Sequence, residues 1–128
     1  MEMGLVYTVL KLSNPKNEKL KPIEVTALVD TGAMHLCIPS DLAHRLKLEE
    51  NDYREIATAD GQKHVCPYVG PVKVHFNNRS CFTGAIVLGN EVLLGAVPME
   101  DMDLVVHPLK KKVVVNPDSP DIPSAIVK

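Results

Sequence analysis

One short segment of the sequence carries residue types that do acid–base chemistry. Asp30, Thr31 and Gly32 place a carboxylate, a hydroxyl and a glycine in succession, directly after the apolar run Val25–Val29. A short β-prone run that ends in Asp and Gly is typical of a buried strand followed by a tight turn. A carboxylate at the end of a buried strand is costly unless it is hydrogen-bonded or shares its charge. Because catalytic groups concentrate on such turns, we take Asp30 as the candidate catalytic residue.

The wider context of Asp30 strengthens this interpretation, because most Asp-Thr-Gly tripeptides taken alone are ordinary surface turns. Ala33 follows the tripeptide, and Val92-Leu93-Leu94-Gly95 supplies a second apolar segment that ends in glycine. The pairing of Leu28–Ala33 with Val92–Gly95 and a terminal strand resembles the retropepsin-like aspartic proteases of clan AA, in their single-domain type. The resemblance covers roughly residues 5 to 117, and the paired motifs are fairly specific.

The resemblance implies a mechanism that needs two carboxylates. In aspartic proteolysis one carboxylate stays ionised and activates a water, while the other is protonated and polarises the scissile carbonyl. The chain has one Asp-Thr-Gly, and 128 residues leave no room for a second lobe. A homodimer with twofold symmetry would bring Asp30 of each copy together. By the same resemblance Thr31 braces the two active-site loops across the dimer, Gly32 lets the backbone approach the carboxylates, and Leu93-Leu94-Gly95 packs beneath the loop.

A second candidate region lies around Ala59-Asp60-Gly61. Asp-Gly between two β-prone runs predicts a hairpin, here over Tyr53–Tyr68. In the family that the chain resembles, such a hairpin is a flap that folds over the substrate, so Ala33 and the three tip residues become candidate substrate-binding residues. The tip holds one glycine where retroviral flaps hold several, and Met34-His35 departs from the polar residue that often follows the alanine. A rigid hairpin without a gating role therefore remains an alternative.

The composition excludes several other classes of function. The net charge is −2 and the only charge cluster is Lys110-Lys111-Lys112, so the sequence predicts no nucleic-acid partner. No apolar stretch reaches membrane-spanning length, and Met1–Gly4 lacks the features of a signal peptide. Three cysteines without Cys-x-x-Cys spacing favour reduced thiols, and with them a cytoplasmic protein. The starting methionine favours a free-standing chain.

Three further chemistries find little support in the sequence. The five histidines and three cysteines show neither i, i+4 helical nor Cys-x-x-Cys spacing, so the sequence predicts no metal site. It also lacks a glycine-rich phosphate loop, and we expect no cofactor. A nucleophilic pair of Cys37 with His35 or His64 would need a tertiary coincidence.

The pattern of apolar residues and turn signals predicts an all-β fold. Six or more short strands with one or two short helices favour a closed or partly closed β-barrel of a single lobe. The expected strands cover 5–12, 22–29, 34–38, 53–58, 62–68, 71–76, 80–88 and 113–115, and the expected helices cover 39–46 and 98–103. His107-Pro108 is expected to close the second helix. The protease-like domain is expected over 1–117, followed by a proline-containing, flexible tail over 118–128.

The sequence therefore predicts an aspartic endopeptidase that acts as a homodimer on peptide or protein substrates bound as an extended strand. Its activity optimum is expected to be mildly acidic, where one proton sits on the Asp30 pair. Two alternatives remain open. The first is a non-catalytic domain of the same fold that serves dimerisation or peptide binding, because fold alone does not guarantee activity. The second is an unrelated β-barrel in which Asp-Thr-Gly is only a turn.

Overall fold

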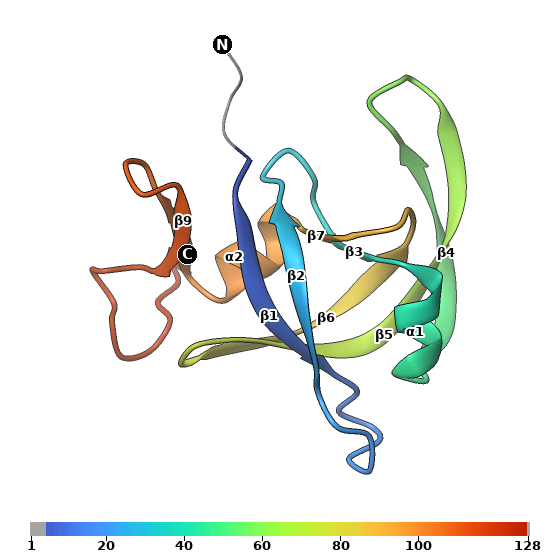
Figure 1. Ribbon diagram of the computed structural model, residues 1–128, viewed down its shortest axis with the longest axis horizontal. Coiled ribbons are helices and arrows are strands. Elements are labelled where there is room, and N and C mark those ends of the chain that lie inside the picture. Colours follow the sequence, from blue (N-terminus) through green and yellow to red (C-terminus); the bar gives the residue numbers. More distant parts are fainter. Residues whose placement is uncertain (1–4, 128) are drawn as a thin grey trace.

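A computed structural model describes residues 5–127 of the chain. Two short helices and a set of mostly short strands make up this part (Figure 1). The elements in chain order are β1 (Tyr7–Ser13), β2 (Ile23–Val29), β3 (Leu36–Ile38), α1 (Ser40–Arg45), β4 (Glu49–Ala57), β5 (Lys63–Phe76), β6 (Arg79–Val87), β7 (Val92–Leu94), α2 (Ala96–Asp101), β8 (Leu104–His107) and β9 (Lys112–Val115). Neither helix of the described part is long and apolar enough to span a membrane.

Within residues 5–127, six strands form a closed barrel, and the closure comes from an additional pairing of β1. The strand order is β1-β2-β7-β3-β6-β5-β4, and β1 also pairs with β5, with Lys11 opposite His75 and Ser13 opposite Lys73. β4 lies outside the ring and pairs with β5, so that the two form a hairpin that extends from the barrel (Figure 1). This arrangement confirms the predicted all-β, single-lobed barrel with two short helices.

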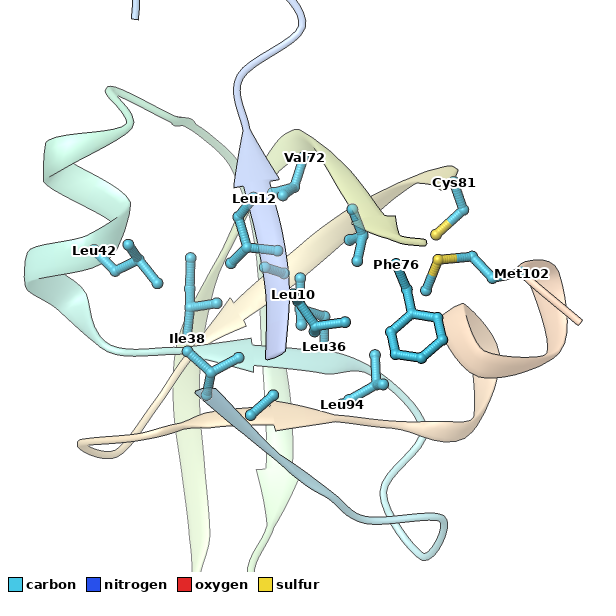
Figure 2. Close-up of a cluster of buried hydrophobic side chains, with 14 of the residues drawn as sticks. Leu10, Leu12, Leu36, Ile38, Leu42, Val72, Phe76, Cys81, Leu94 and Met102 are labelled. Atoms are coloured by element: carbon cyan, nitrogen blue, oxygen red, sulfur yellow. The ribbon is translucent and has the colours of Figure 1, made fainter. Parts of the chain in front are cut away.

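Alternation along the strands fills the inside of the barrel with apolar side chains. On β1, Thr8, Leu10 and Leu12 are buried while the residues between them are exposed, which is the period-two pattern of a half-buried strand. Figure 2 shows these leucines in one cluster with buried side chains from other strands, with Leu42 of α1 and with Met102, which directly follows α2. The labelled side chains in contact with this core include Leu36, Ile38, Leu42, Val72, Phe76, Leu94 and Met102. The core thereby fixes β3 and β7 against each other.

β5 is one continuous strand where the sequence predicts two. The expected break at residues 69–70 is instead a register shift between Val69 and Val72 inside the strand. Proline cannot donate a ladder hydrogen bond, so it is confined to the edges and bulges of a sheet. Gly70 has a φ of +150°, and a Cβ there would lie 3.2 Å from the Cα of Gly84, so β5 and β6 approach closely. Because β4 pairs with β5 only as far as Gly70, the irregularity separates the hairpin from the barrel portion of β5.

The sequence prediction also misses a strand near the C-terminus. β8 pairs with β9 as a separate two-stranded sheet, with Val105 opposite Val114. The sequence predicts that His107-Pro108 closes the second helix, but α2 ends at Asp101 and His107 belongs to β8. α2 begins at Ala96 and not at the predicted Pro98, because the backbone turns into the helix directly after Gly95.

Hydrogen bonds hold the segment after β9 to the rest of the domain. The Asp103 carboxylate accepts bonds from the Asn116 amide at 3.0 Å, from the Ser124 backbone N–H at 2.9 Å and from the Ser119 hydroxyl. The buried Arg79 guanidinium donates to the backbone carbonyl of Ser119. The domain boundary at residue 117 and the flexibility of the tail stay predictions. These bonds identify the contacts that would have to break for the tail to move.

Candidate active site

Asp30 is positioned by the parallel pairing of β2 with β7. The register puts Val29 beside Leu94, so Asp30 leaves the end of β2 next to Gly95. The Asp30 backbone N–H donates a hydrogen bond to the Leu94 carbonyl at 3.0 Å. On the other side, the Val29 N–H donates to the Val6 carbonyl at 2.8 Å. Hydrogen bonds to segments on both sides therefore fix the backbone that carries Asp30.

The Asp30 loop, residues 30–35, connects β2 to β3 and folds back on the carboxylate. The Gly32 N–H donates to Oδ1 of Asp30 at 3.0 Å, and the Ala33 N–H donates to the Asp30 carbonyl at 3.1 Å. This is a turn that Asp favours, with the side chain bonded to the backbone two residues on. Thr31 and Gly32 are exposed, and Asp30 is half-buried. The loop thus orients the carboxylate and leaves it accessible.

Gly95 supports the Asp30 loop from beneath. α2 begins directly after it, and the Ala96 N–H donates to the Ala33 carbonyl at 2.8 Å. A Cβ at Gly95 would lie 2.8 Å from the Ala33 carbonyl oxygen and closer still to that of His35. Because both obstacles are backbone atoms, only glycine fits between α2 and the loop. The apolar-apolar-glycine segment therefore packs against the loop through its glycine.

The Asp30 loop and the β4–β5 hairpin line one cavity of about 460 Å³. Its lining residues come from the loop, from the hairpin and from the strands behind them: Asp30, Gly32, Ala33, Cys37, Ile56, Ala57, Thr58, Ala59, Leu88 and Leu93. The walls are small or aliphatic, and of these described residues only Asp30 is an acid. An oriented carboxylate at the edge of an apolar cavity can accept a proton or hold a water next to a bound ligand.

The cavity brings together some of the residues that the sequence places at the site. Four of the seven predicted site residues line it: Asp30, Gly32, Ala33 and Ala59. Three lie outside its lining: Thr31, Asp60 and Gly61. The functional roles of all seven stay predictions.

The tip of the β4–β5 hairpin is closed by its own hydrogen bonds. The Thr58 N–H donates to the Gln62 carbonyl at 2.9 Å, and the Asp60 carboxylate accepts bonds from the Thr58 hydroxyl and from the Gln62 N–H. The bond from the Thr58 hydroxyl, followed by that from Gln62, lowers the pKa of Asp60. Gly61 has a φ of +84°, in the left-handed region that favours glycine. Asp60 and Gly61 therefore shape the turn itself.

The sequence suggested Leu93 only as packing beneath the loop and Cys37 only as part of a nucleophilic pair, but both side chains line the cavity. They lie opposite each other where β3 and β7 pair antiparallel. Leu93 alternates with the fully buried Leu94, and this period-two pattern is a signal that could have placed Leu93 on the cavity side of β7. No comparable signal marks Cys37, because β3 is three residues long and every one of them is buried.

The surroundings of Cys37 disfavour a nucleophilic role. Burial raises the pKa of its thiol, and the neighbouring Cys66 and the charge of Asp30 raise it further. A thiol with a raised pKa is protonated near neutral pH and is a weak nucleophile. His35 directs its ring toward Tyr68, with 6.1 Å between the ring centroids. Across residues 5–127, no group of three or more His, Cys, Asp or Glu side chains is placed to hold a metal ion.

Three exposed apolar side chains lie on the Asp30 loop or beside it, and we call them the loop-face patch: Leu5, Met34 and Val97. Met34 is on the loop and is 63% exposed, while Val97 in α2 is 46% exposed and donates its N–H to the Met34 carbonyl at 3.0 Å. Leu5 is 62% exposed and precedes Val6, which bonds to the end of β2. Exposed apolar surface next to a functional loop is a candidate protein–protein interface.

A protein-family model matches the part of the chain that holds both motifs. The family is described as "gag-polyprotein putative aspartyl protease", and the match covers residues 19–97. This range includes Asp30-Thr31-Gly32 and Val92-Leu93-Leu94-Gly95 and spans more than half of the 128 residues. No protein with a curated description matches the chain.

Solved structures of retropepsin type share the fold. The retroviral protease-like domain of Ddi1 from Leishmania major is 12% identical with a TM-score of 0.58, and the match covers 91% of this chain and 91% of that one. A retropepsin-like aspartic protease from Rickettsia conorii is 16% identical with a TM-score of 0.51, over 86% of this chain and 92% of that one. These similarities confirm that the barrel is retropepsin-like.

Proposed function

The chain belongs to the gag-polyprotein aspartyl protease family, and from this premise we propose that it is an aspartic endopeptidase that works as a homodimer. The cavity between the Asp30 loop and the β4–β5 hairpin is the observation that carries the proposal. Asp30 lines this cavity, and the Gly32 N–H orients its carboxylate. An accessible, oriented carboxylate beside an apolar cavity is what general acid–base chemistry on a bound peptide needs.

The second carboxylate of the mechanism would come from a second copy of the chain. One acid lines the described cavity, and a shared-proton pair needs two. A twofold axis beside the Asp30 loop would bring the two Asp30 carboxylates together in an isologous contact. The loop-face patch supports an interface at this position, because its side chains expose apolar surface around the loop. In this proposal the dimer completes the site.

With one proton shared by the pair, the two carboxylates take different roles. The ionised Asp30 accepts a proton from a water, whose oxygen attacks the scissile carbonyl carbon, while the protonated Asp30 donates a hydrogen bond to the carbonyl oxygen. The tetrahedral intermediate collapses when the C–N bond breaks and a proton passes to the leaving amine. Gly32 keeps each carboxylate oriented through its N–H, 3.0 Å from Oδ1. Thr31 is proposed to brace the two loops across the dimer.

The substrate would be an extended peptide held between the Asp30 loop and the β4–β5 hairpin. Ala33 lines the cavity from the loop and Ala59 lines it from the hairpin. Asp60 and Gly61 are proposed as further contacts at the tip, where closure of the hairpin over the peptide would exclude water. The three cysteines are free thiols, which supports a reducing compartment such as the cytoplasm.

Cleavage of a mixed library of unfolded peptides between about pH 4 and 7 tests the proposal, because the singly protonated pair is the active form. The chain should cleave the library, and Asp30→Asn should not, since the amide keeps the shape of the carboxylate but cannot take up the proton. Asp41→Asn, at an exposed acid of α1, is the matched control and should cleave normally. A well-folded dimer that cleaves nothing across this range would overturn the endopeptidase and favour a peptide-binding module.

A further inference from the structure

Tyr68 lies at the root of the β4–β5 hairpin, where it belongs to the hairpin and to the barrel at once. It pairs with Asp52 on β4 and with Ile86 on β6. The side chain is half-buried, and it packs against the cluster of Cys37, Cys66 and Ile86. Cys37 also lines the Asp30 cavity. Tyr68 is therefore one layer of side chains away from the cavity wall.

The Tyr68 ring rests on Gly84 of β6 because that position has no side chain. A Cβ at Gly84 would lie 2.6 Å from Cε1 of Tyr68 and closer still to its Cζ and hydroxyl. Gly84 is not in a left-handed conformation, so backbone geometry does not require glycine there. The open space over Gly84 is thus filled by the ring of Tyr68, and the two residues fit as a pair.

Two cationic or ionisable side chains complete the surroundings of the ring. The Arg54 guanidinium from β4 stacks over it with 4.2 Å between Cζ and the ring centroid, and is held by an ion pair with Asp52 at 2.8 Å. The ring of His35, from the Asp30 loop, meets Tyr68 at an interplanar angle of 63°. Tyr68 therefore touches the hairpin, the barrel and the loop that carries Asp30.

We propose that Tyr68 is a positioning residue that sets the distance between the β4–β5 hairpin and Asp30, through its packing on Gly84 and its stacking with Arg54. The role rests on the proposed function, in which the hairpin closes over a peptide. β5 runs five residues from Lys63 to Tyr68, or about 17 Å at ~3.3 Å per residue, so a rotation of about 10° at Tyr68 moves the tip by about 3 Å. Displacements of that size are large for chemistry that needs atoms placed to about 1 Å.

Hydrogen exchange of the hairpin tip, residues 56–62, tests this role without relying on cleavage. Tyr68→Ala removes the ring, and Gly84→Ala displaces it; each should speed exchange at the tip about tenfold relative to β1 of the same molecule. Tyr68→Phe keeps the ring on Gly84 and should restore the exchange rate of the native chain. The proposal would be overturned if, in both alanine variants, the exchange rate of the tip relative to β1 were the same as in the native chain.

A matched pair of substitutions on the hairpin separates stacking from loss of an ion pair. Arg54 and Lys63 each hold one ion pair on the hairpin, with Asp52 at 2.8 Å and with Glu55 at 3.7 Å, but only Arg54 stacks on Tyr68. Arg54→Met should speed tip exchange and Lys63→Met should not. Equal effects of the two would overturn the role of the stack, and this pair remains informative if Gly84→Ala does not fold.

Kinetics on a cleaved peptide add the catalytic readout. In Tyr68→Ala we expect KM to rise about tenfold together with a fall in kcat, since displacement of a closing element changes both. A KM and kcat equal to those of the native chain would contradict positioning, even if the variant were less stable to heat. If the native chain cleaves nothing while the exchange results hold, the proposed peptidase activity fails and the placement of the hairpin by Tyr68 stands.

Discussion

Asp30 and Leu94 are joined by a hydrogen bond of 3.0 Å from the backbone N–H of Asp30 to the carbonyl of Leu94. The bond continues the parallel pairing of β2 with β7 by one residue. It therefore links Asp30-Thr31-Gly32 to Val92–Gly95, two motifs that are far apart in the sequence. Gly95 follows Leu94 and contacts the backbone of the Asp30 loop. The position of the candidate catalytic carboxylate therefore depends on backbone packing as much as on its own turn.

Gly95→Ala should destabilise the domain and misplace the Asp30 loop. The added Cβ meets the carbonyl oxygens of Ala33 and His35, which are backbone atoms and cannot rotate away. We expect the free energy of unfolding to fall by about 2 kcal/mol or more, as measured by urea denaturation. Gly89→Asn is the control, because that position has open space and Asn tolerates its φ of +76°. Equal stability of Gly95→Ala and the native chain would contradict this close packing of Gly95 against the loop.

Val97→Lys should weaken the proposed dimer. Val97 belongs to the loop-face patch, so an isologous contact would bring two new ammonium groups to one apolar interface. We expect the dimer Kd to rise at least about tenfold in sedimentation equilibrium, with cleavage lost in parallel. Phe82→Lys changes an apolar residue that is 63% exposed on β6, away from the Asp30 loop, and should leave the Kd unaltered. A dimer Kd that rises in Phe82→Lys but not in Val97→Lys would place the interface elsewhere.

Much of the fold and the core of the site could be predicted because their signals are local. Asp30-Thr31-Gly32 after an apolar run, and Ala59-Asp60-Gly61 between β-prone runs, both specify their turns with short-range chemistry. Gly70-Pro71 is also a residue pair typical of turns. It forms a bulge instead, because β5 pairs with β6 on both sides of it. The place of Cys37 in the cavity wall could not be predicted from the sequence, because it depends on which strands pair with β3 in the folded chain.

Asp103→Asn should loosen the C-terminal segment in a pH-dependent way. Hydrogen bonds from Ser119, then from Asn116 and the Ser124 N–H, lower the pKa of Asp103 from 3.8 to about 2. Because the folded-state pKa lies below the ordinary value, the carboxylate stabilises the folded state above about pH 4 and loses this effect as the pH falls toward 2. The difference in unfolding free energy between the native chain and Asp103→Asn should be constant from about pH 5 to 7 and shrink below about pH 4.

The control for this prediction is Asp118→Asn on the same segment. Its backbone N–H bonds to Asn116, and the substitution leaves that bond in place. Urea denaturation across the pH series should show no comparable pH-dependent difference for this variant. A difference between the native chain and Asp103→Asn that persists unchanged down to about pH 2 would show that the charge of Asp103 does not hold the segment.

Cys37→Ala separates the aspartic mechanism from a thiol mechanism. Burial, Cys66 and Asp30 raise the pKa of the Cys37 thiol, so it should react slowly with iodoacetamide near neutral pH. We expect the substitution to lower kcat/KM by less than about tenfold, through the altered cavity wall. Loss of cleavage by a factor of about 1,000 or more, with rapid alkylation of Cys37 in the native chain, would instead identify a nucleophilic cysteine.

Mixing the native chain with Asp30→Asn measures most directly whether two copies share one site. At a fixed amount of native chain, increasing amounts of Asp30→Asn should draw it into heterodimers that hold a single carboxylate. If the dimers exchange freely and assemble at random, an equal amount of the variant should reduce cleavage to about one half, and a threefold excess to about one quarter. Asp41→Asn added in the same way should not inhibit. Cleavage that stays at its starting value as Asp30→Asn is added would show that one copy acts alone, and would contradict the shared Asp30 pair.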